Sequence, residues 1–294
     1  MRITGTIVKG IAGFYYVKTE DGTVYQCKAR GIFKKDGIVP AVGDQVEITV
    51  QQDGDAVVER IFSRINVFSR PPIANVETFV IVTAAKNPDP SPGLVDKFLV
   101  MAEKNHTEIL LCVNKIDLAD AADVAALCAI YEGIYPVYPI SAAKRQGLDV
   151  LEEALAGKQA ALAGPSGAGK STLLNALIQQ ERMETGHVSS KTGRGRHTTR
   201  HAELFEMRLG GSVFDTPGFT SFDLPEMEES ELEHCYPEFS VCLGKCRYDN
   251  CRHLKEPGCA VRESVSQGNI RKERYRSYAA QLLEIREKEK NRYG

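Results

Sequence analysis

The chain has 294 residues, a formal net charge of −2 and 43% hydrophobic residues, a composition typical of a globular protein of about two domains. The near-neutral charge excludes a polycationic protein, so any face for nucleic acid must be local. No apolar run approaches the roughly 20 residues of a membrane span, and the N-terminus lacks the pattern of a signal peptide. We therefore expect a cytoplasmic protein without membrane association, whose eight cysteines stay reduced and suit a metal site better than disulfides.

Short strand-like segments fill residues 1–70. Five runs rich in β-branched and aromatic residues are separated by glycine-containing turns, at 3–8, 13–18, 23–29, 46–50 and 56–61. Such short, evenly spaced strands favour a small all-β barrel, with the OB type first. Four basic residues cluster near its middle: Lys28, Arg30, Lys34 and Lys35. This loop either binds RNA or is merely solvated, and the sequence does not decide between the two.

Residues 71–222 alternate between apolar strands and helical segments, after a linker marked by Arg70–Pro71–Pro72. We expect strands at 79–84, 109–113, 135–140, 160–163, 203–209 and 212–214, and helices at 94–104, 121–131, 148–155 and from 172 onward. This alternation predicts a mostly parallel sheet covered by helices.

A guanine-reading motif follows the second of these strands. Asn114–Lys115–Ile116–Asp117 has the pattern N-K-x-D, in which the Asp carboxylate accepts two hydrogen bonds from guanine N1–H and the exocyclic amine. Adenine lacks that donor pair, so the motif argues against an ATP-dependent kinase. The stem of Lys115 can lie along the purine face. Ser141–Ala142, after the third strand, is expected to contact the base through backbone N–H groups.

A phosphate-binding loop comes later in the chain. It has the pattern G-x-x-x-x-G-K-S and consists of Gly164, Pro165, Ser166, Gly167, Ala168, Gly169, Lys170 and Ser171. Lys170 is expected to reach the β- and γ-phosphates, and the Ser171 hydroxyl to bind Mg²⁺. Thr172 continues into a helix whose N-terminal dipole adds to the anion site.

Two further segments resemble the switches of GTPases. Thr198–Thr199 lies in a basic stretch without acidic residues, 186–202, where a switch Thr would bind Mg²⁺ and sense the γ-phosphate; the alternative is a plain polar loop. Asp215–Thr216–Pro217–Gly218 resembles D-x-x-G, whose Asp helps to hold Mg²⁺ and whose Gly N–H meets the γ-phosphate.

The residue that orients the attacking water in Ras-like enzymes is missing. That Gln would follow D-x-x-G, and here Phe219 occupies its place. His197, beside the two threonines, is the best candidate to replace it, although it could instead contact RNA or solvent. The catalytic residues predicted from the sequence are therefore His197, Lys170 and Thr199.

The motifs occur in an unusual order. N-K-x-D and Ser-Ala precede the phosphate loop, whereas in ordinary GTPases of this type the phosphate loop comes first. This is the order of a circularly permuted GTPase, which the fold tolerates because chain termini commonly lie close together at the surface.

Residues 223–294 combine an acidic stretch with a basic, cysteine-rich one. Segment 223–238 has seven carboxylates and no Lys or Arg, and segment 245–276 has nine basic and four acidic residues. Within the latter, Cys246, Cys251, His253 and Cys259 can form a closed tetrahedral Zn²⁺ site, with Cys235 and Cys242 as alternative ligands. A long charged helix follows from 269 to about 292; its residues Arg271, Lys272, Arg274 and Arg276 face either RNA or solvent.

The fold class expected is thus an α/β circularly permuted P-loop GTPase domain, flanked by an N-terminal OB-type barrel and a small α-rich zinc-binding domain. The motifs together resemble the RsgA family of GTPases that depend on the small ribosomal subunit. The resemblance covers the whole chain and depends on segments 114–117, 164–171, 193–199, 215–218 and 246–259.

This resemblance implies binding of GTP and GDP, and hydrolysis coupled to late maturation of the small subunit. It also implies an OB fold that contacts rRNA, one Zn²⁺, Mg²⁺ with the nucleotide, and action as a monomer. We interpret the protein as a switch whose hydrolysis times its release from the particle. The alternative is an RNA-binding module in which the nucleotide only stabilises the fold.

Overall fold

A computed structural model describes residues 1–31, 33, 37–51, 56–69, 71–178, 202–215 and 224–293. By its internal contacts the chain divides into two compact units. One comprises Met1–Thr78, Val150–Leu162 and Leu173–Phe219, and the other comprises Phe79–Asp149, Ala163–Thr172 and Thr220–Gly294.

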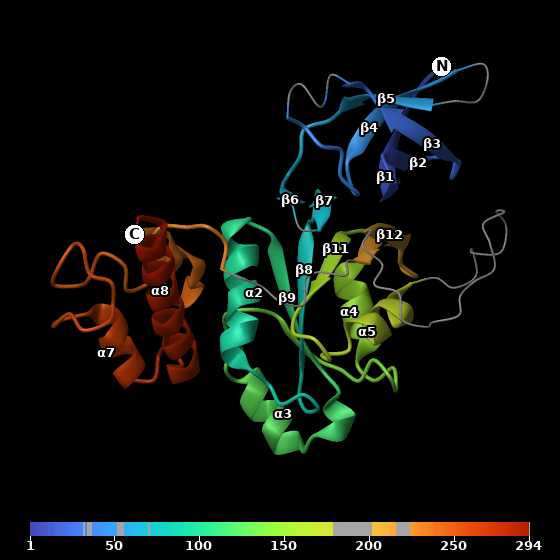
Figure 1. Ribbon diagram of the computed structural model, residues 1–294. Coiled ribbons are helices and arrows are strands. Elements are labelled where there is room, and N and C mark those ends of the chain that lie inside the picture. The colour runs from blue at the N-terminus through green and yellow to red at the C-terminus, as the bar shows by residue number, and fades with distance from the viewer. Residues whose placement is uncertain are drawn as a thin grey trace. The chain divides into compact units, whose positions relative to one another are not determined.

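The first unit begins with the predicted barrel, blue in Figure 1. Its strands are β1 (Arg2–Ile11), β2 (Phe14–Thr19), β3 (Val24–Ala29), β4 (Gln45–Val50) and β5 (Ala56–Ile61). Neighbours pair antiparallel in the order β3-β2-β1-β4-β5, and the parallel pair β3–β5 closes the circuit. Apolar residues at alternate positions fill the interior, where Ile7, Val17, Val46, Ile48 and Val58 are fully buried. This confirms the barrel, since period-2 burial is what a curved sheet with one inner face requires.

A short hairpin stands where the sequence predicted a linker. Strands β6 (Val67–Ser69) and β7 (Pro72–Ala74) pair antiparallel. Pro72 lacks an N–H but is tolerated at the end of a two-stranded ribbon. The side chain of Asn66 holds both backbone groups of Val76, accepting from its N–H at 2.9 Å and donating to its carbonyl at 2.8 Å. Pro72 therefore belongs to a strand, and the residues predicted as a linker lie between two paired strands.

The first unit also contains strands from the middle of the chain. β11 (Gln159–Ala163) runs parallel to β13 (Ser212–Asp215), and β12 (Glu203–Glu206) runs antiparallel to β13. β12 pairs with the barrel strand β1 at Lys9 and Glu203, whose side chains form an ion pair at 3.0 Å. Helices α4 (Leu148–Leu155) and α5 (Lys170–Leu177) follow the predicted ranges, whereas β12 ends earlier than expected.

The second unit has three strands in the order β10-β9-β8: β8 (Thr78–Ala84), β9 (Glu108–Asn114) and β10 (Val137–Pro139). Every residue of β8 is buried, as expected of a strand covered on both faces. Helices α2 (Pro92–Lys104) and α3 (Ala121–Cys128) accompany them. α3 ends three residues before its predicted limit, and β10 is shorter than its apolar run.

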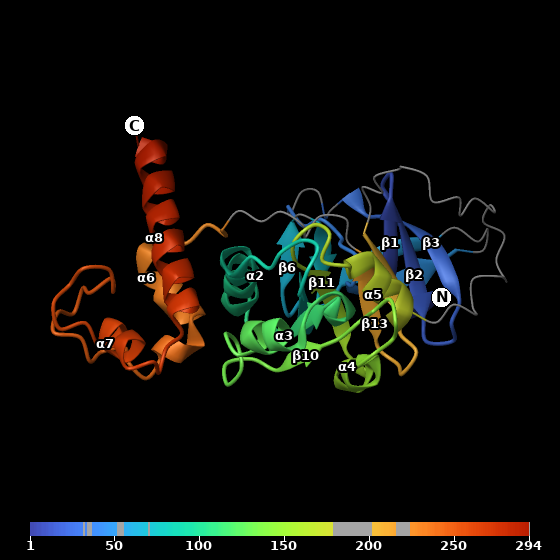
Figure 2. The same ribbon diagram turned by 90° about the horizontal axis from the view of Figure 1, so that it is seen from below.

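The C-terminal part of the second unit is helical, as predicted. It contains α6 (Glu229–Leu232), the 3-10 turns η3 (Glu233–Cys235) and η4 (Pro237–Phe239), α7 (Ala260–Ser266) and α8 (Lys272–Tyr293). Figures 1 and 2 show α8 lying between α2 and α7. Tyr236, Phe239 and Tyr278 form its core, with ring centroids about 5 Å apart. Among the described helices, none is long and apolar enough to cross a membrane.

A buried ion cluster fastens α8 to α2. Arg274 of α8 is completely buried, and its Nη1 donates to Asp96 Oδ1 of α2 at 2.6 Å while its Nε donates to Glu238 Oε1 at 2.7 Å. The guanidinium also lies 4.6 Å from the ring centre of Tyr236. Arg274 therefore faces neither RNA nor solvent, which corrects the expectation drawn from the charge of the helix; Arg271, Lys272 and Arg276 are exposed.

Candidate nucleotide and metal sites

The phosphate loop is shaped by glycines that no other residue could replace. Gly164 has φ of +140°, and a Cβ there would come within 2.0 Å of the Val82 carbonyl oxygen in β8. Gly169 has φ of +94°, and a Cβ there would come within 2.3 Å of Asn114 Nδ2. The loop is thus pressed against β8 on one side and against the guanine-reading motif on the other, which places backbone N–H groups for phosphate.

Lys170 begins α5 beneath this loop. Its ammonium donates to the carbonyls of Gly164 and Pro165, at 2.7 and 2.8 Å. Burial lowers the pKa of Lys170 to about 8, because the charged form loses hydration. These two hydrogen bonds hold the Lys170 ammonium next to the phosphate loop, where it could bind a phosphate oxygen. Ser171 and Thr172 follow in the first turn of α5 and are exposed.

Asn114 joins three loops of the nucleotide site. Its Nδ2 donates to the Ala168 carbonyl at 2.9 Å, and its Oδ1 accepts from the N–H groups of Lys115 and Ala142, at 2.8 and 3.0 Å. The phosphate loop, N-K-x-D and Ser-Ala are therefore held together although they lie far apart in sequence. Asn114 is 2% exposed, so its side-chain amide holds these loops in place.

Asp117 is held as an ionised acceptor. It lies in the short turn η1 (Ile116–Leu118), which Lys115 opens in the left-handed region with φ of 63°. A hydrogen bond from the Ser141 hydroxyl holds the pKa of Asp117 below its usual range, and the ammonium of Lys144, at 3.6 Å, acts in the same direction. The Lys115 ammonium donates to the Asn87 carbonyl. The sequence predicted Ser141 here as a base contact and missed Lys144.

One of the predicted switch residues lies in the described part of the chain. Asp215 is the last residue of β13, opposite Glu203 in register. The other switch residues lie outside the described part of the chain, namely His197, Thr198, Thr199 and Gly218, as do Lys34 and Lys35. Their predicted roles remain predictions.

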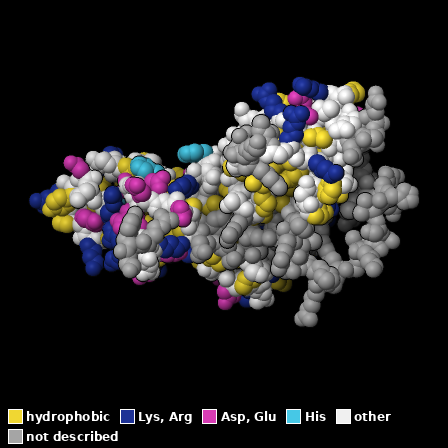
Figure 3. All heavy atoms as spheres, turned by 45° about the horizontal axis from the view of Figure 1, so that its top comes forward, with side chains coloured by type: hydrophobic (Ala, Val, Ile, Leu, Met, Phe, Trp, Pro, Cys, Tyr) yellow, Lys and Arg dark blue, Asp and Glu magenta, His cyan; other side chains and the backbone are white. Residues whose placement is uncertain are grey.

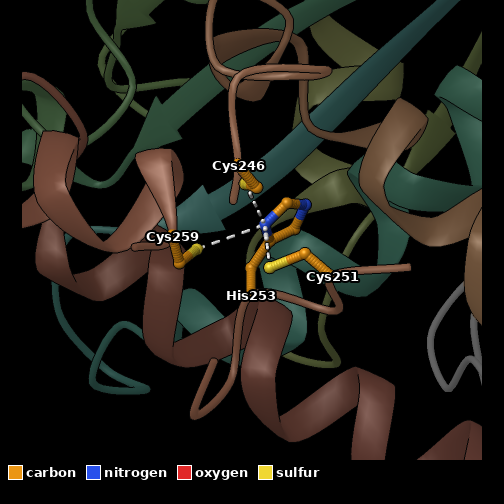
Figure 4. Close-up of side chains that lie close together, drawn as sticks. All are labelled: Cys246, Cys251, His253 and Cys259. Atoms are coloured by element: carbon orange, nitrogen blue, oxygen red, sulfur yellow. Dashed lines mark hydrogen bonds between the residues drawn. The ribbon is translucent and has the colours of Figure 1, made fainter. Parts of the chain in front are cut away.

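The predicted metal ligands converge in the C-terminal part. The ligand atoms of Cys246, Cys251, His253 and Cys259 all lie within 4.8 Å of one another, and three of these residues are buried. Figure 4 shows the three sulfurs around one ring nitrogen, His253 Nδ1, at 3.6, 3.5 and 3.3 Å. One nitrogen cannot exchange hydrogen bonds with three thiols at once. Tetrahedral zinc, with bonds of about 2.3 Å to sulfur and 2.0 Å to nitrogen, separates these atoms by about 3.5 Å, so this donor set fits Zn²⁺.

The two alternative cysteines have other partners. Cys242 Sγ lies 3.2 Å from Ser264 Oγ, and Cys235 Sγ donates to the Glu231 carbonyl. Neither belongs to the cluster, so the geometry favours the ligand set that the spacing indicated first.

Two carboxylates to which the sequence assigned no role bind the ring and the turn of His253. Glu233 Oε2 lies 2.8 Å from Nε2 of His253, the ring nitrogen that points away from the sulfurs. Glu256 accepts from the N–H groups of Arg252, Leu254 and Lys255, at 2.8 to 3.0 Å, and so closes the turn in which His253 has φ of +59°.

The barrel, the nucleotide loops and their order in the chain define a P-loop GTPase with circularly permuted motifs. The family model described as RsgA N-terminal domain matches residues 4–58, and the one described as RsgA GTPase matches residues 61–225. The chain belongs to the RsgA GTPase family and is a GTP-hydrolysing enzyme. This confirms the predicted family and fold class.

Relatives and solved structures agree over the full length. A protein of Clostridium beijerinckii named "Small ribosomal subunit biogenesis GTPase RsgA" is 45% identical, covering 99% of this chain and 100% of its own. One of the same name from Caldanaerobacter subterraneus is 43% identical, covering 99% of each. The crystal structure of YjeQ from Thermotoga maritima is 37% identical with a TM-score of 0.84, covering 97% of this chain and 99% of that one. YloQ, described as a circularly permuted GTPase, is 36% identical with a TM-score of 0.81, covering 98% and 96%.

Proposed function

We propose that this GTPase binds the small ribosomal subunit and couples GTP hydrolysis to late maturation of the subunit and to its own release. The observation that carries the proposal is the rigid junction at Asn114, which joins a guanine-reading loop to a phosphate loop in a chain whose full-length relatives are named for small-subunit biogenesis. It would act as a monomer in the cytoplasm, where its thiols stay reduced.

Each nucleotide motif has a defined part in this proposal. Asp117 reads guanine, with Asn114, Lys115, Ser141 and Ala142 forming the base pocket. The loop from Gly164 to Thr172 holds the phosphates, and Ser171, Asp215 and the Thr198–Thr199 pair hold Mg²⁺, with Gly218 at the γ-phosphate. Support comes from the hydrogen bonds that lock the first two groups into one framework.

Catalysis in the proposal needs the particle. Lys170 stabilises charge on the phosphates, Thr199 senses the γ-phosphate, and His197 orients the attacking water in place of the Gln that Phe219 replaces. The subunit would position His197, which is worth about 10²–10⁴-fold in rate. On hydrolysis, the segment after Asp215 would reposition the C-terminal region and weaken its grip.

The domain assignment gives each region one task. Residues 1–70 contact rRNA, residues 71–222 bind and hydrolyse GTP, and residues 223–294 carry one structural Zn²⁺ without a catalytic water, since four protein ligands close the coordination sphere. Freshly purified protein should contain one zinc per chain. Cys251→Ala should lose the metal and unfold the zinc loop while GTP affinity stays nearly unchanged; protein without zinc would refute this assignment.

Single-turnover hydrolysis of GTP tests the proposed mechanism. The wild-type rate should rise when small subunits are added, and His197→Ala should lose that rise while its GTP affinity remains. A mutant that keeps the full stimulated rate would overturn the role of His197. A wild-type rate indifferent to subunits would favour the alternative, an RNA-binding module that the nucleotide merely stabilises.

A further inference from the structure

The ring of His253 has two nitrogens with different surroundings. Nδ1 faces the three cysteine sulfurs, whereas Nε2 lies 2.8 Å from the Glu233 carboxylate. The His253 side chain is 3% exposed and that of Glu233 is 17% exposed. An imidazole that gives its Nδ1 lone pair to a metal must carry its proton on Nε2, and this proton needs an acceptor because water has little access.

We propose that Glu233 is the positioning residue of the metal site, selecting the His253 tautomer with the proton on Nε2 and fixing the ring so that Nδ1 completes the tetrahedron. This inference rests on the zinc site proposed above. Glu233 itself does not contact the metal position, since its carboxylate is on the far side of the ring. Partners of this kind typically contribute 10- to 100-fold to metal affinity.

Glu233 also links the metal to the helix that precedes it. Immediately upstream, Glu229 of α6 forms a two-point ion pair with Arg286 of α8, at 2.7 and 2.8 Å. Glu231 of α6 faces Lys104 at the end of α2, 3.4 Å away. A metal held through His253 therefore fixes η3, and with it α6, between α2 and α8. The acidic stretch that the sequence showed is thereby divided among specific partners.

The test compares zinc release from full-length wild type, Glu233→Gln and Glu233→Ala, using the chromogenic chelator 4-(2-pyridylazo)resorcinol. Glu287→Gln, which neutralises an exposed carboxylate of α8, is the matched control. Glu233→Ala should release zinc about 10- to 100-fold faster, and Glu233→Gln, which keeps an oxygen acceptor, should fall between it and wild type. The control should match wild type.

Nitrogen NMR of histidine-labelled, zinc-loaded protein supplies a readout that loss of packing alone would not give. The wild type should show a protected His253 Nε2–H and a metal-bound Nδ1, and the Nε2–H should lose protection in Glu233→Ala. Should the C-terminal part of Glu233→Ala fail to fold, judged by the near-ultraviolet circular dichroism of its tyrosines, Glu233→Gln decides. Wild type without zinc would defeat the metal site itself, whereas zinc-loaded variants with wild-type release rates would defeat only the role of Glu233.

Discussion

Asp117 illustrates how neighbours prepare a single side chain for recognition. The Ser141 hydroxyl and the Lys144 ammonium both favour its charged form, so the carboxylate is oriented before any base arrives. Preorganisation of this kind reduces the cost of ordering the site on binding. The base selectivity of the enzyme should therefore depend on this one carboxylate.

Asp117→Asn should weaken GTP binding by about 10- to 100-fold, because a charge-assisted pair of hydrogen bonds is lost. The variant should instead favour xanthosine triphosphate, which presents an oxygen acceptor where guanine has its amine. Competition between the two nucleotides, measured by equilibrium binding, checks the prediction. Unchanged GTP affinity would show that another group reads the base.

The lowered pKa of Lys170 should make nucleotide binding depend on pH. Its pKa of about 8 in the free protein means that above this pH the side chain is neutral, while phosphate favours the charged form and raises the pKa. Binding should therefore take up a proton above pH 8, and GTP affinity should fall by at most about tenfold per pH unit there. Calorimetry at pH 8.5 in two buffers of different ionisation enthalpy measures the uptake. Lys170→Arg, which stays charged, should abolish it.

At the residue scale, prediction from sequence succeeded where chemistry prescribes a local pattern. The motifs around Lys170 and Asp117 and the spacing from Cys246 to Cys259 are of this kind. It failed for Glu233 and Lys144, which are selected by proximity in space. Glu233 lies 20 residues from His253, and nothing in the acidic stretch distinguishes it from its six neighbours.

At the scale of elements, the contact between α2 and α8 depends on the buried charges of Asp96, Glu238 and Arg274. Such a cluster adds little net stability over an apolar one, but removing one member leaves an uncompensated charge. The two helices also share a half-buried ion pair, Lys97 with Glu284 at 2.7 Å. Arg274–Asp96 and Lys97–Glu284 join the same two helices and differ in burial. Comparing them shows how the cost of removing a charge depends on burial.

Arg274→Met should destabilise the protein by about 3–5 kcal/mol, while Lys97→Met should cost less than about 1 kcal/mol. Without Arg274, burial raises the pKa of Asp96 further above its unfolded value. A carboxyl whose pKa is higher in the folded state than in the unfolded state destabilises the folded protein when it is ionised. This penalty disappears as the pH falls through the higher pKa, because the group becomes protonated and neutral. The stability gap between Arg274→Met and wild type should thus narrow as the pH is lowered toward the raised pKa of Asp96. Urea unfolding at several pH values measures this gap, and a gap independent of pH would contradict the role of Asp96.

The types of most elements were predictable because the spacing of apolar residues in the sequence matches the buried face of a strand or helix. The barrel strands and α2 lie close to their expected ranges. The hairpin β6–β7 was missed because the prolines after Arg70 suggested a break. The hydrogen bonds between the Asn66 side chain and the Val76 backbone, which accompany the hairpin, join residues ten apart. The burial of Arg274 was missed because helical periodicity shows on which side of the helix it lies, but not that Asp96 and Glu238 neutralise it there.

For the whole molecule, charge pairing decides how a nearly neutral protein could bind rRNA. Figure 3 shows basic and acidic side chains intermingled over the C-terminal helices, at the left of the view. Within segment 245–276, Arg252 lies 3.8 Å from Glu229, and Arg274 is buried against Asp96 and Glu238. The excess of basic residues in segment 245–276 is therefore partly neutralised within the protein. Binding to rRNA would then depend most on basic residues outside such ion pairs.

Association with small subunits should weaken linearly on a logarithmic salt scale, because each neutralised phosphate releases counterions. Lys34→Glu and Lys35→Glu, in the basic loop of the barrel, should each weaken binding and lower the salt slope by about one, without changing intrinsic GTP hydrolysis. Lys290→Glu, at the far end of α8, makes the same charge change as a control and should leave the slope unaltered. Binding measured by sedimentation at several salt concentrations provides the slopes. Salt-independent association would mean that the barrel docks on ribosomal protein, since a contact to rRNA phosphates cannot escape counterion release.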